Sequence, residues 1–139
     1  MEWSFLLAIL GKLGFSPIWL FWIRICILST SFSILLNGSP YGFFSLGKGL
    51  RQEDPLSPFL FILGAEVFSR LMFKKERNGS LKGLRIARNC TPIHHLLFAD
   101  DLLIFGEASV LVAASIKSCL DKYCRWSGQS IMFLNPPSG

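Results

Sequence analysis

Two adjacent aspartates, Asp100 and Asp101, interrupt an apolar stretch over residues 93–106 (IHHLLFADDLLIFG). Unpaired carboxylates among apolar side chains lose hydration, so this arrangement needs a compensating partner. A divalent cation would supply it, because hard oxygen ligands select Mg²⁺ or Mn²⁺. Two such ions held by carboxylates can activate a 3′-hydroxyl and stabilise a leaving pyrophosphate. The pair is therefore a candidate catalytic and metal-binding site for nucleotidyl transfer.

The same pair can also be a solvated turn, in which both carboxylates face water and Asp101 caps a helix. Two-residue hairpin turns prefer Asn-Gly or Asp-Gly, whereas Asp100-Asp101 has no glycine and brings two like charges together. Local turn preference does not account for it. The tetrapeptide Phe98-Ala99-Asp100-Asp101 alone leaves both interpretations open.

The segments around the pair predict helices and hairpins in alternation. Residues 2–13 favour a helix that Gly14 ends, and Ser16-Pro17 supplies an N-cap and first-turn proline for a second helix. Both helices are expected to be largely buried. From Ser31 the apolar residues alternate, reach Asn37-Gly38 and resume, which is typical of a hairpin whose second strand Pro40 weakens.

The second half of the chain predicts a central helix, the aspartate hairpin and a covering helix. Residues 47–58 form a loop in which Asp54-Pro55 or Ser57-Pro58 can cap a helix over 58–74. That helix is apolar on nearly every face, so it is expected in the middle of the fold. Two short strands follow over 93–106, and residues 107–126 have the spacing of an amphipathic helix that ends at Ser127-Gly128. The expected fold class is α+β, with antiparallel hairpins packed against buried helices.

Charge and composition favour an anionic partner. The chain has 139 residues, 51% of them hydrophobic, and 14 Lys and Arg against 9 Asp and Glu, a net charge of +5. Half of the basic residues lie in one stretch that only Glu76 opposes: Arg70, Lys74, Lys75, Arg77, Lys82, Arg85 and Arg88. This stretch predicts contact with a nucleic-acid backbone, chiefly through Lys74, Lys75 and Arg77, or else forms a solvated face.

The sequence also contains segments that resemble a membrane span and a zinc site. A membrane span over residues 17–36 has the right length, but Arg24 near its middle and four hydroxyl residues disfavour it. A zinc site at Cys90, His94 and His95 has none of the usual structural spacings. The favoured alternative places His94 and His95 on opposite faces of the strand that enters the aspartate turn.

Two ordered motifs carry a family resemblance. Residues 49–58 (GLRQEDPLSP), followed some forty residues later by Phe98-Ala99-Asp100-Asp101, resemble the palm of non-LTR reverse transcriptases, especially plant LINE-type elements. Glu2-Trp3-Ser4-Phe5-Leu6, Leu36-Asn37-Gly38 and Ser127-Gly128-Gln129 look like further landmarks of that family in the right order. The resemblance covers essentially the whole chain.

The resemblance implies a role for each matched residue. Asp100 would be a metal ligand with Asp101 beside it, and Mg²⁺ or Mn²⁺ would be the cofactor. Arg51 and Gln52 would lie near template and incoming nucleotide, and Phe98 near the primer end. The implied partners are an RNA template, a DNA primer, a deoxynucleoside triphosphate and the missing polymerase segments, with membrane disfavoured. An intracellular location, nucleus or cytoplasm, follows from the family alone.

Departures from the family pattern limit the expected activity. The chain begins at Met1, after the position where the family carries a further catalytic aspartate, and Glu53 stands where the family has glycine. We expect residues 1–134 to be a partial reverse-transcriptase domain, an RNA-directed DNA polymerase fragment inactive alone, with a tail over 135–139. A nucleic-acid-binding remnant without catalysis and, less favoured, a small membrane protein spanning 17–36 are the alternatives.

Overall fold

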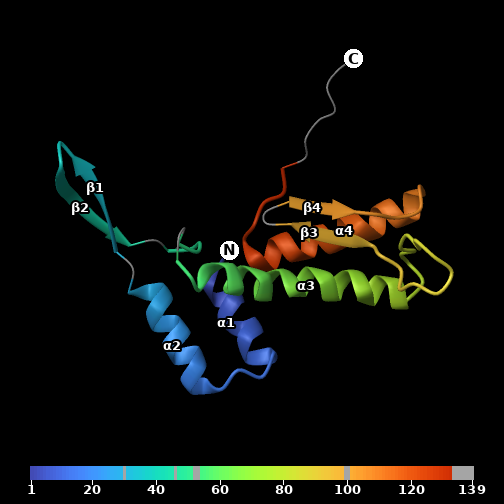
Figure 1. Cartoon of the computed structure of the whole chain (residues 1–139), viewed down its shortest axis with the longest axis horizontal. Helices are drawn as coiled ribbons and strands as arrows, with labels where there is room; N and C mark the ends of the chain where they lie inside the picture. Colours follow the sequence, from blue (N-terminus) through green and yellow to red (C-terminus); the bar gives the residue numbers. More distant parts are fainter. Residues whose placement is uncertain (30, 46, 52–53, 99–100, 133–139) are drawn as a thin grey trace, which may run out of the picture. The chain divides into compact units, whose positions relative to one another are not determined.

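A computed structural model describes residues 1–29, 31–45, 47–51, 54–98 and 101–132. Its elements alternate between helices and antiparallel hairpins (Figure 1). In chain order they are α1 (Trp3–Lys12), α2 (Pro17–Leu28), β1 (Ser31–Leu36), β2 (Ser39–Ser45), α3 (Ser57–Arg77), β3 (His95–Phe98), β4 (Asp101–Ile104) and α4 (Val110–Ser127). The predicted α+β class is confirmed.

The described contacts divide the chain into two compact units. The first comprises residues 1–64 with the segment from Trp126 onward, and the second comprises residues 65–125. Helix α3 contributes its first turns to the first unit and the rest to the second. Each unit has its own buried apolar residues.

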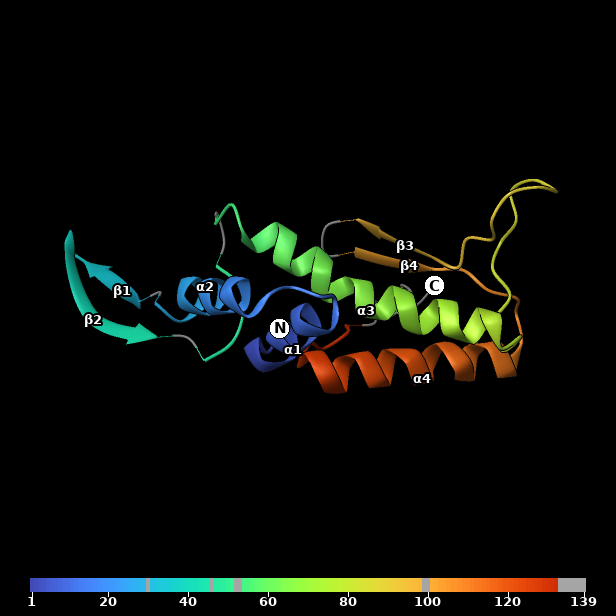
Figure 2. The ribbon, with the colours of Figure 1, turned by 90° about the horizontal axis from the view of Figure 1, so that it is seen from below.

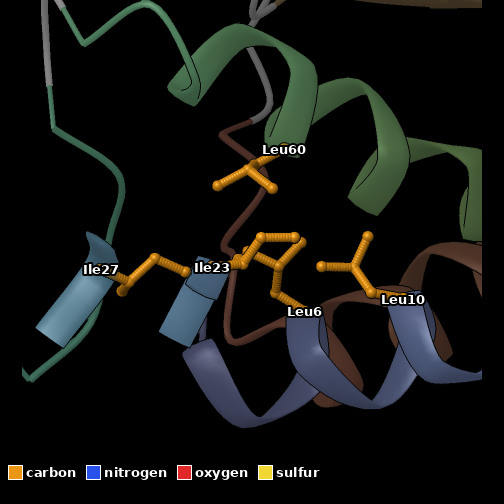
Figure 3. Packing of buried hydrophobic residues seen from close by; sticks show 5 residues of the cluster. All are labelled: Leu6, Leu10, Ile23, Ile27 and Leu60. Carbon is orange, nitrogen blue, oxygen red and sulfur yellow. The ribbon is translucent and has the colours of Figure 1, made fainter. Parts of the chain in front are cut away.

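The first unit packs α1, α2 and the start of α3 around five aliphatic side chains. Leu6 and Leu10 of α1, Ile23 and Ile27 of α2, and Leu60 of α3 converge in one cluster (Figure 3). The spacing of four residues within each pair places both side chains on one helical face. The helix start at Pro17 is fixed as the sequence predicts, because the Ser16 hydroxyl accepts a hydrogen bond from Trp19 N at 3.4 Å.

The prediction that the first two helices are largely buried is wrong for α2. Side chains along its outer face are more than half exposed, including Trp19 at 62%. The reason is geometric: α2 is apolar around its whole circumference, but only the face carrying Ile23 and Ile27 meets other elements of the unit. The large side chains of α2 that are more than half exposed are Ile18, Trp19, Phe21 and Trp22.

Residues 17–36, which were weighed as a membrane span, do not form one continuous helix. Helix α2 ends at Leu28, and strand β1 begins at Ser31. Across the described ranges, no helix combines the length and apolar character that crossing a membrane requires.

The β1–β2 hairpin has the turn that the sequence predicts. Leu36 pairs with Ser39, which leaves Asn37 and Gly38 as a two-residue turn with positive φ values of 51° and 81°. Positive φ at both central residues defines the type I′ turn that joins twisted strands well. Pro40 does not delay the second strand, since it lies within β2 and pairs with Leu35. The hairpin remains largely exposed, so its expected packing against buried helices is not observed.

The second unit places α3, from Ala65 onward, beside both α4 and the β3–β4 hairpin (Figure 2). Phe68 joins the three elements, because its ring lies 5.7 Å from that of Tyr123 in α4 and 5.5 Å from that of His95 in β3. The predicted helix over 58–74 is present as Ser57–Arg77. The helix is not covered on nearly every face as expected, since Phe59, Ile62 and Phe73 lie on an exposed face.

Helix α4 begins three residues later than predicted. The Ser109 hydroxyl accepts a hydrogen bond from Val112 N at 3.2 Å and so caps the helix. The helix ends at Ser127 as expected, where Gly128 has a φ of +65°. A Cβ at Gly128 would also crowd the Glu2 side chain, so glycine suits this position by its conformation and by its lack of a side chain.

Candidate functional site

The β3–β4 hairpin presents an exposed carboxylate. Phe98, the last residue of β3, pairs with Asp101, the first residue of β4, and both side chains are exposed. The prediction that Asp100-Asp101 forms the centre of the turn is therefore wrong for Asp101, which the strand register places in β4. Asp100 lies outside the described residues. Exposure of Asp101 means that it can meet a ligand without first leaving a buried partner.

The hairpin around Asp101 has several apolar side chains that no other described residue covers. Phe98 is 80% exposed, and Leu96, Leu97 and Leu103 are each more than two-fifths exposed. Such a surface favours contact with the flat face of a base or with apolar side chains of another chain. The sequence predicted the apolar run but not which of its side chains are exposed.

The described donor set at Asp101 fits a metal ion only weakly. Within the described ranges, no group of three or more His, Cys, Asp or Glu side chains is arranged to hold a metal. Oxygen-ligand sites for Mg²⁺ usually combine one or two carboxylates with substrate phosphates. Asp101 can therefore supply part of such a site. The zinc hypothesis for Cys90, His94 and His95 gains no support, because these residues are not among any such group.

The loop that leads into α3 is fastened to the N-terminus of the chain. Trp3 Nε1 donates a hydrogen bond to Gly49 O at 2.6 Å, and Gly49 N donates to Met1 O at 2.9 Å. Farther along, Leu56 N donates to Asp54 Oδ1 at 2.9 Å, which tightens the turn before the helix. Arg51 is exposed and lines a small pocket with residues of this loop. Gln52 and Glu53 lie outside the described residues.

Three sequence landmarks meet in the first unit. Besides the contacts of Met1 and Trp3 with Gly49, Glu2 N donates a hydrogen bond to Ser127 O at 2.7 Å. Ser127 is completely buried, and its hydroxyl accepts from Gln129 N at 3.2 Å. Segments at both ends and the middle of the chain are thus joined by main-chain bonds, which sequence spacing alone does not reveal.

The basic end of α3 provides a charged surface. Lys74 and Arg77 are exposed and Lys75 is partly buried, all within the last turns of the helix. Cations at a helix C-terminus also interact favourably with the helix dipole. Arg70 differs from them, since its Nε lies 3.0 Å from Glu66 Oε1. The remaining cations of the stretch, Lys82, Arg85 and Arg88, are exposed in the segment between α3 and β3.

The two histidines form a network that the sequence did not predict. His94 and His95 were expected on opposite faces of a strand, but their rings stack with centroids 4.7 Å apart. The reason is that β3 begins only at His95, so His94 does not follow the strand alternation. Ser69 and Glu76 contact the pair from α3. Their spacing of seven residues, two helical turns, is a signal that could have identified a shared polar face.

Comparison with known proteins gives a limited result. No model of a known protein family matches the chain. Among curated proteins, it is similar to the uncharacterized mitochondrial protein AtMg01250 of Arabidopsis thaliana, with 51% identity over 67 residues. The matched segment covers 48% of this chain and 55% of that protein, so the chain spans about half the length of this relative. The similarity relates the chain to a plant mitochondrial protein without assigning an activity.

Proposed function

We propose that this chain is part of the palm of a LINE-type reverse transcriptase, an RNA-directed DNA polymerase, and that it does not catalyse polymerisation alone. The observation that carries the proposal is the exposed Asp101 at the start of β4, opposite the exposed Phe98. The same chain contains a loop over 49–58 that leads directly into a long helix, as the family resemblance implies. The order of these features supports the assignment.

In this proposal Asp101 acts with Asp100 as a carboxylate pair for Mg²⁺ or Mn²⁺. When bound, the ion would polarise the phosphates of a deoxynucleoside triphosphate. Phe98 would lie against the primer end, where its exposed ring can stack on a base. Arg51 and Gln52 would contact template and nucleotide. The RNA template and DNA primer are the proposed macromolecular partners.

The exposed apolar side chains support the proposal that further polymerase segments pack against this chain. Large hydrophobic residues are exposed on α2, β1 and β2, and two-stranded sheets are marginally stable in water without a covering layer. Further segments of a polymerase would cover them. Because the similar Arabidopsis protein is a mitochondrial protein, we propose a mitochondrial location for this chain, alongside the nucleus or cytoplasm expected from the family.

Manganese binding tests the carboxylate pair directly. Mn²⁺ added to the full chain is expected to broaden the backbone amide signals of Phe98, Asp101 and Leu102 before others, with a dissociation constant on the order of 10⁻³ M. The weakness follows from the small number of ligands at Asp101. The doubly substituted variant Asp100→Asn with Asp101→Asn should lose this local broadening.

Asp121→Asn is the matched control for the manganese measurement. Asp121 is an exposed acid on α4, so its substitution removes a carboxylate charge away from the hairpin. The control should keep the broadening around Asp101. Equal broadening of both acidic regions, or broadening unchanged in the double variant, would show that the pair is no metal site.

Primer extension tests the proposed lack of independent activity. The purified full chain, given an RNA template, a DNA primer, all four deoxynucleoside triphosphates and Mg²⁺ or Mn²⁺, is expected to give no product above the protein-free background. Asp101 has no described group of metal ligands around it that could hold both ions. Extension that disappears in Asp101→Asn would contradict the inactive assignment and support the family.

A nucleic-acid-binding remnant is the second candidate function. It is favoured by the exposed Lys74 and Arg77 and the partly buried Lys75 at the C-terminal end of α3. Charges in this arrangement bind phosphates without reading base sequence. This function needs neither the metal nor the missing segments.

A further inference from the structure

The protein has two histidines, and both belong to one network of polar contacts within the second unit. His94 Nδ1 lies 2.6 Å from His95 Nδ1, and the two rings are within 13° of parallel. The other nitrogen of each ring contacts α3: His95 Nε2 lies 2.8 Å from the Ser69 hydroxyl, and His94 Nε2 lies 3.5 Å from Glu76 Oε2. The histidines precede and begin β3, whereas Ser69 and Glu76 belong to α3.

The contact between the two Nδ1 atoms restricts the protons of the pair. A nitrogen pair this close forms a hydrogen bond only when one nitrogen carries a proton and the other accepts it. Glu76 is a carboxylate that accepts, so the proton of neutral His94 belongs on Nε2 and its Nδ1 accepts. His95 then carries its proton on Nδ1, and its Nε2 accepts from the Ser69 hydroxyl. When both histidines are neutral, only this arrangement of their protons satisfies the contacts.

The surroundings of the pair favour its neutral form. His94 is only 2% exposed, and its Nε2 is buried without a hydrogen bond among the described residues. The ring of Phe73 lies 4.5 Å from that of His94, and Phe68 lies against His95. Burial is the largest cause that lowers the pKa of both histidines. The pair is therefore neutral at pH 7.

The charged groups that face the pair come from α3. Glu76 raises the pKa of His94 in opposition to burial, and Glu66, paired with Arg70, does the same for His95. From α4, Tyr123 reaches Phe68, and burial raises its pKa to about 12, so it stays neutral. From β4, Ile104 pairs with His95, and from the residue after this strand, Phe105 N donates a hydrogen bond to His94 O at 2.9 Å.

We propose that His94 and His95 form a proton-sharing clasp that holds the start of β3 on α3 when neutral and releases it on acidification. One added proton can be shared, because Glu76 faces His94 and Ser69 can turn to accept from His95. A second proton places two N–H groups against each other at the Nδ1 contact. The clasp then opens, and β3, which leads to Phe98 and Asp101, loses its attachment to α3.

The direction of the pH effect follows from the lowered pKa values. An unfolded histidine has a pKa of about 6.5, so below that pH the unfolded chain binds more protons than the folded one. The clasp therefore contributes stability that is fully present above about pH 6.5 and is lost as the pH falls through the lower folded values. The unfolding equilibrium constant is expected to rise on the order of tenfold between pH 7.5 and pH 5.

Nitrogen NMR of the full chain with ¹⁵N-labelled histidine tests the clasp. Because the chain has no other histidine, every imidazole signal belongs to the pair. At pH 7.5 we expect one ring with its proton on Nδ1, the other with its proton on Nε2, and a coupling between the two Nδ1 nuclei. Both rings in the Nε2–H form, or two independent titrations near the unperturbed value, would overturn the proposal.

Variants give a second measurement that does not depend on assigning tautomers. The doubly substituted variant His94→Gln with His95→Gln should lose the pH dependence of urea unfolding between pH 5 and pH 7.5. Ser69→Ala should keep a pH dependence, because the contact between the two Nδ1 atoms does not involve the Ser69 hydroxyl. Retention of the full pH dependence in the double variant would overturn the proposal. If that variant does not fold, the wild-type spectrum decides.

Discussion

Replacing Phe68 with alanine is expected to lower the free energy of unfolding of the second unit by about 3–5 kcal/mol, the range found for buried phenylalanines. Phe68 is 1% exposed, and its ring contacts His95 of β3 and Tyr123 of α4. Its removal leaves a cavity where three elements meet. Urea unfolding of the full chain, followed by circular dichroism and by hydrogen exchange of α4 amides, would measure the loss.

Phe59→Ala is the matched control for this prediction. Phe59 has the same side chain on the same helix but is 65% exposed, so its replacement is expected to change stability by no more than about 0.5 kcal/mol. The comparison separates burial from helix propensity, since both substitutions place alanine in α3. Equal effects of the two variants would contradict the position of Phe68 at the centre of the second unit.

The order and type of the elements could be predicted from sequence because local signals determined them. Asn37-Gly38 predicted the β1–β2 turn, Ser16-Pro17 predicted the start of α2, and Gly128 predicted the end of α4. Each signal depends on residues within one turn of the chain. The structure confirms all three.

Burial could not be predicted in the same way, because it depends on what each face meets. Helices α2 and α3 are apolar on most of their circumference, which predicted that both would be buried, yet Trp19 and Ile62 are exposed. Apolar composition shows which residues favour burial but not which partner covers them. The register of β4, which places Asp101 in the strand, depends on pairing with β3 and was likewise outside the reach of local pattern.

The same difference between local and long-range features applies to the candidate site. The sequence proposed Asp101 and the basic residues because their types carry the chemistry, and the family resemblance added Phe98 and Arg51. It did not identify the contacts that join Trp3 to Gly49, which link residues 46 positions apart. It also placed His94 and His95 on opposite faces of a strand, because the predicted strand included His94, one residue before β3 begins. Long-range hydrogen bonds leave no periodic signal in a sequence.

Charge reversal at the end of α3 is expected to weaken RNA binding by about two orders of magnitude at physiological salt. The variant carries Lys74→Glu, Lys75→Glu and Arg77→Glu, and the measurement is fluorescence anisotropy with a single-stranded RNA over a range of salt concentrations. Each phosphate contact of a single strand contributes about 0.7 to the dependence of log K on log salt. If all three cations contact phosphates, the magnitude of the slope should fall by about 2.

The control variant changes the same number of charges on α4, through Lys117→Glu, Lys122→Glu and Arg125→Glu, all at exposed positions. Three reversals of two charges each lower the net charge from +5 to −1 in both variants, so net repulsion of RNA is matched. The control is expected to retain most of the affinity and of the salt slope, because a local phosphate contact depends on position. Equal weakening in both variants would assign the binding to net charge, and wild-type binding insensitive to salt would exclude phosphate contacts altogether.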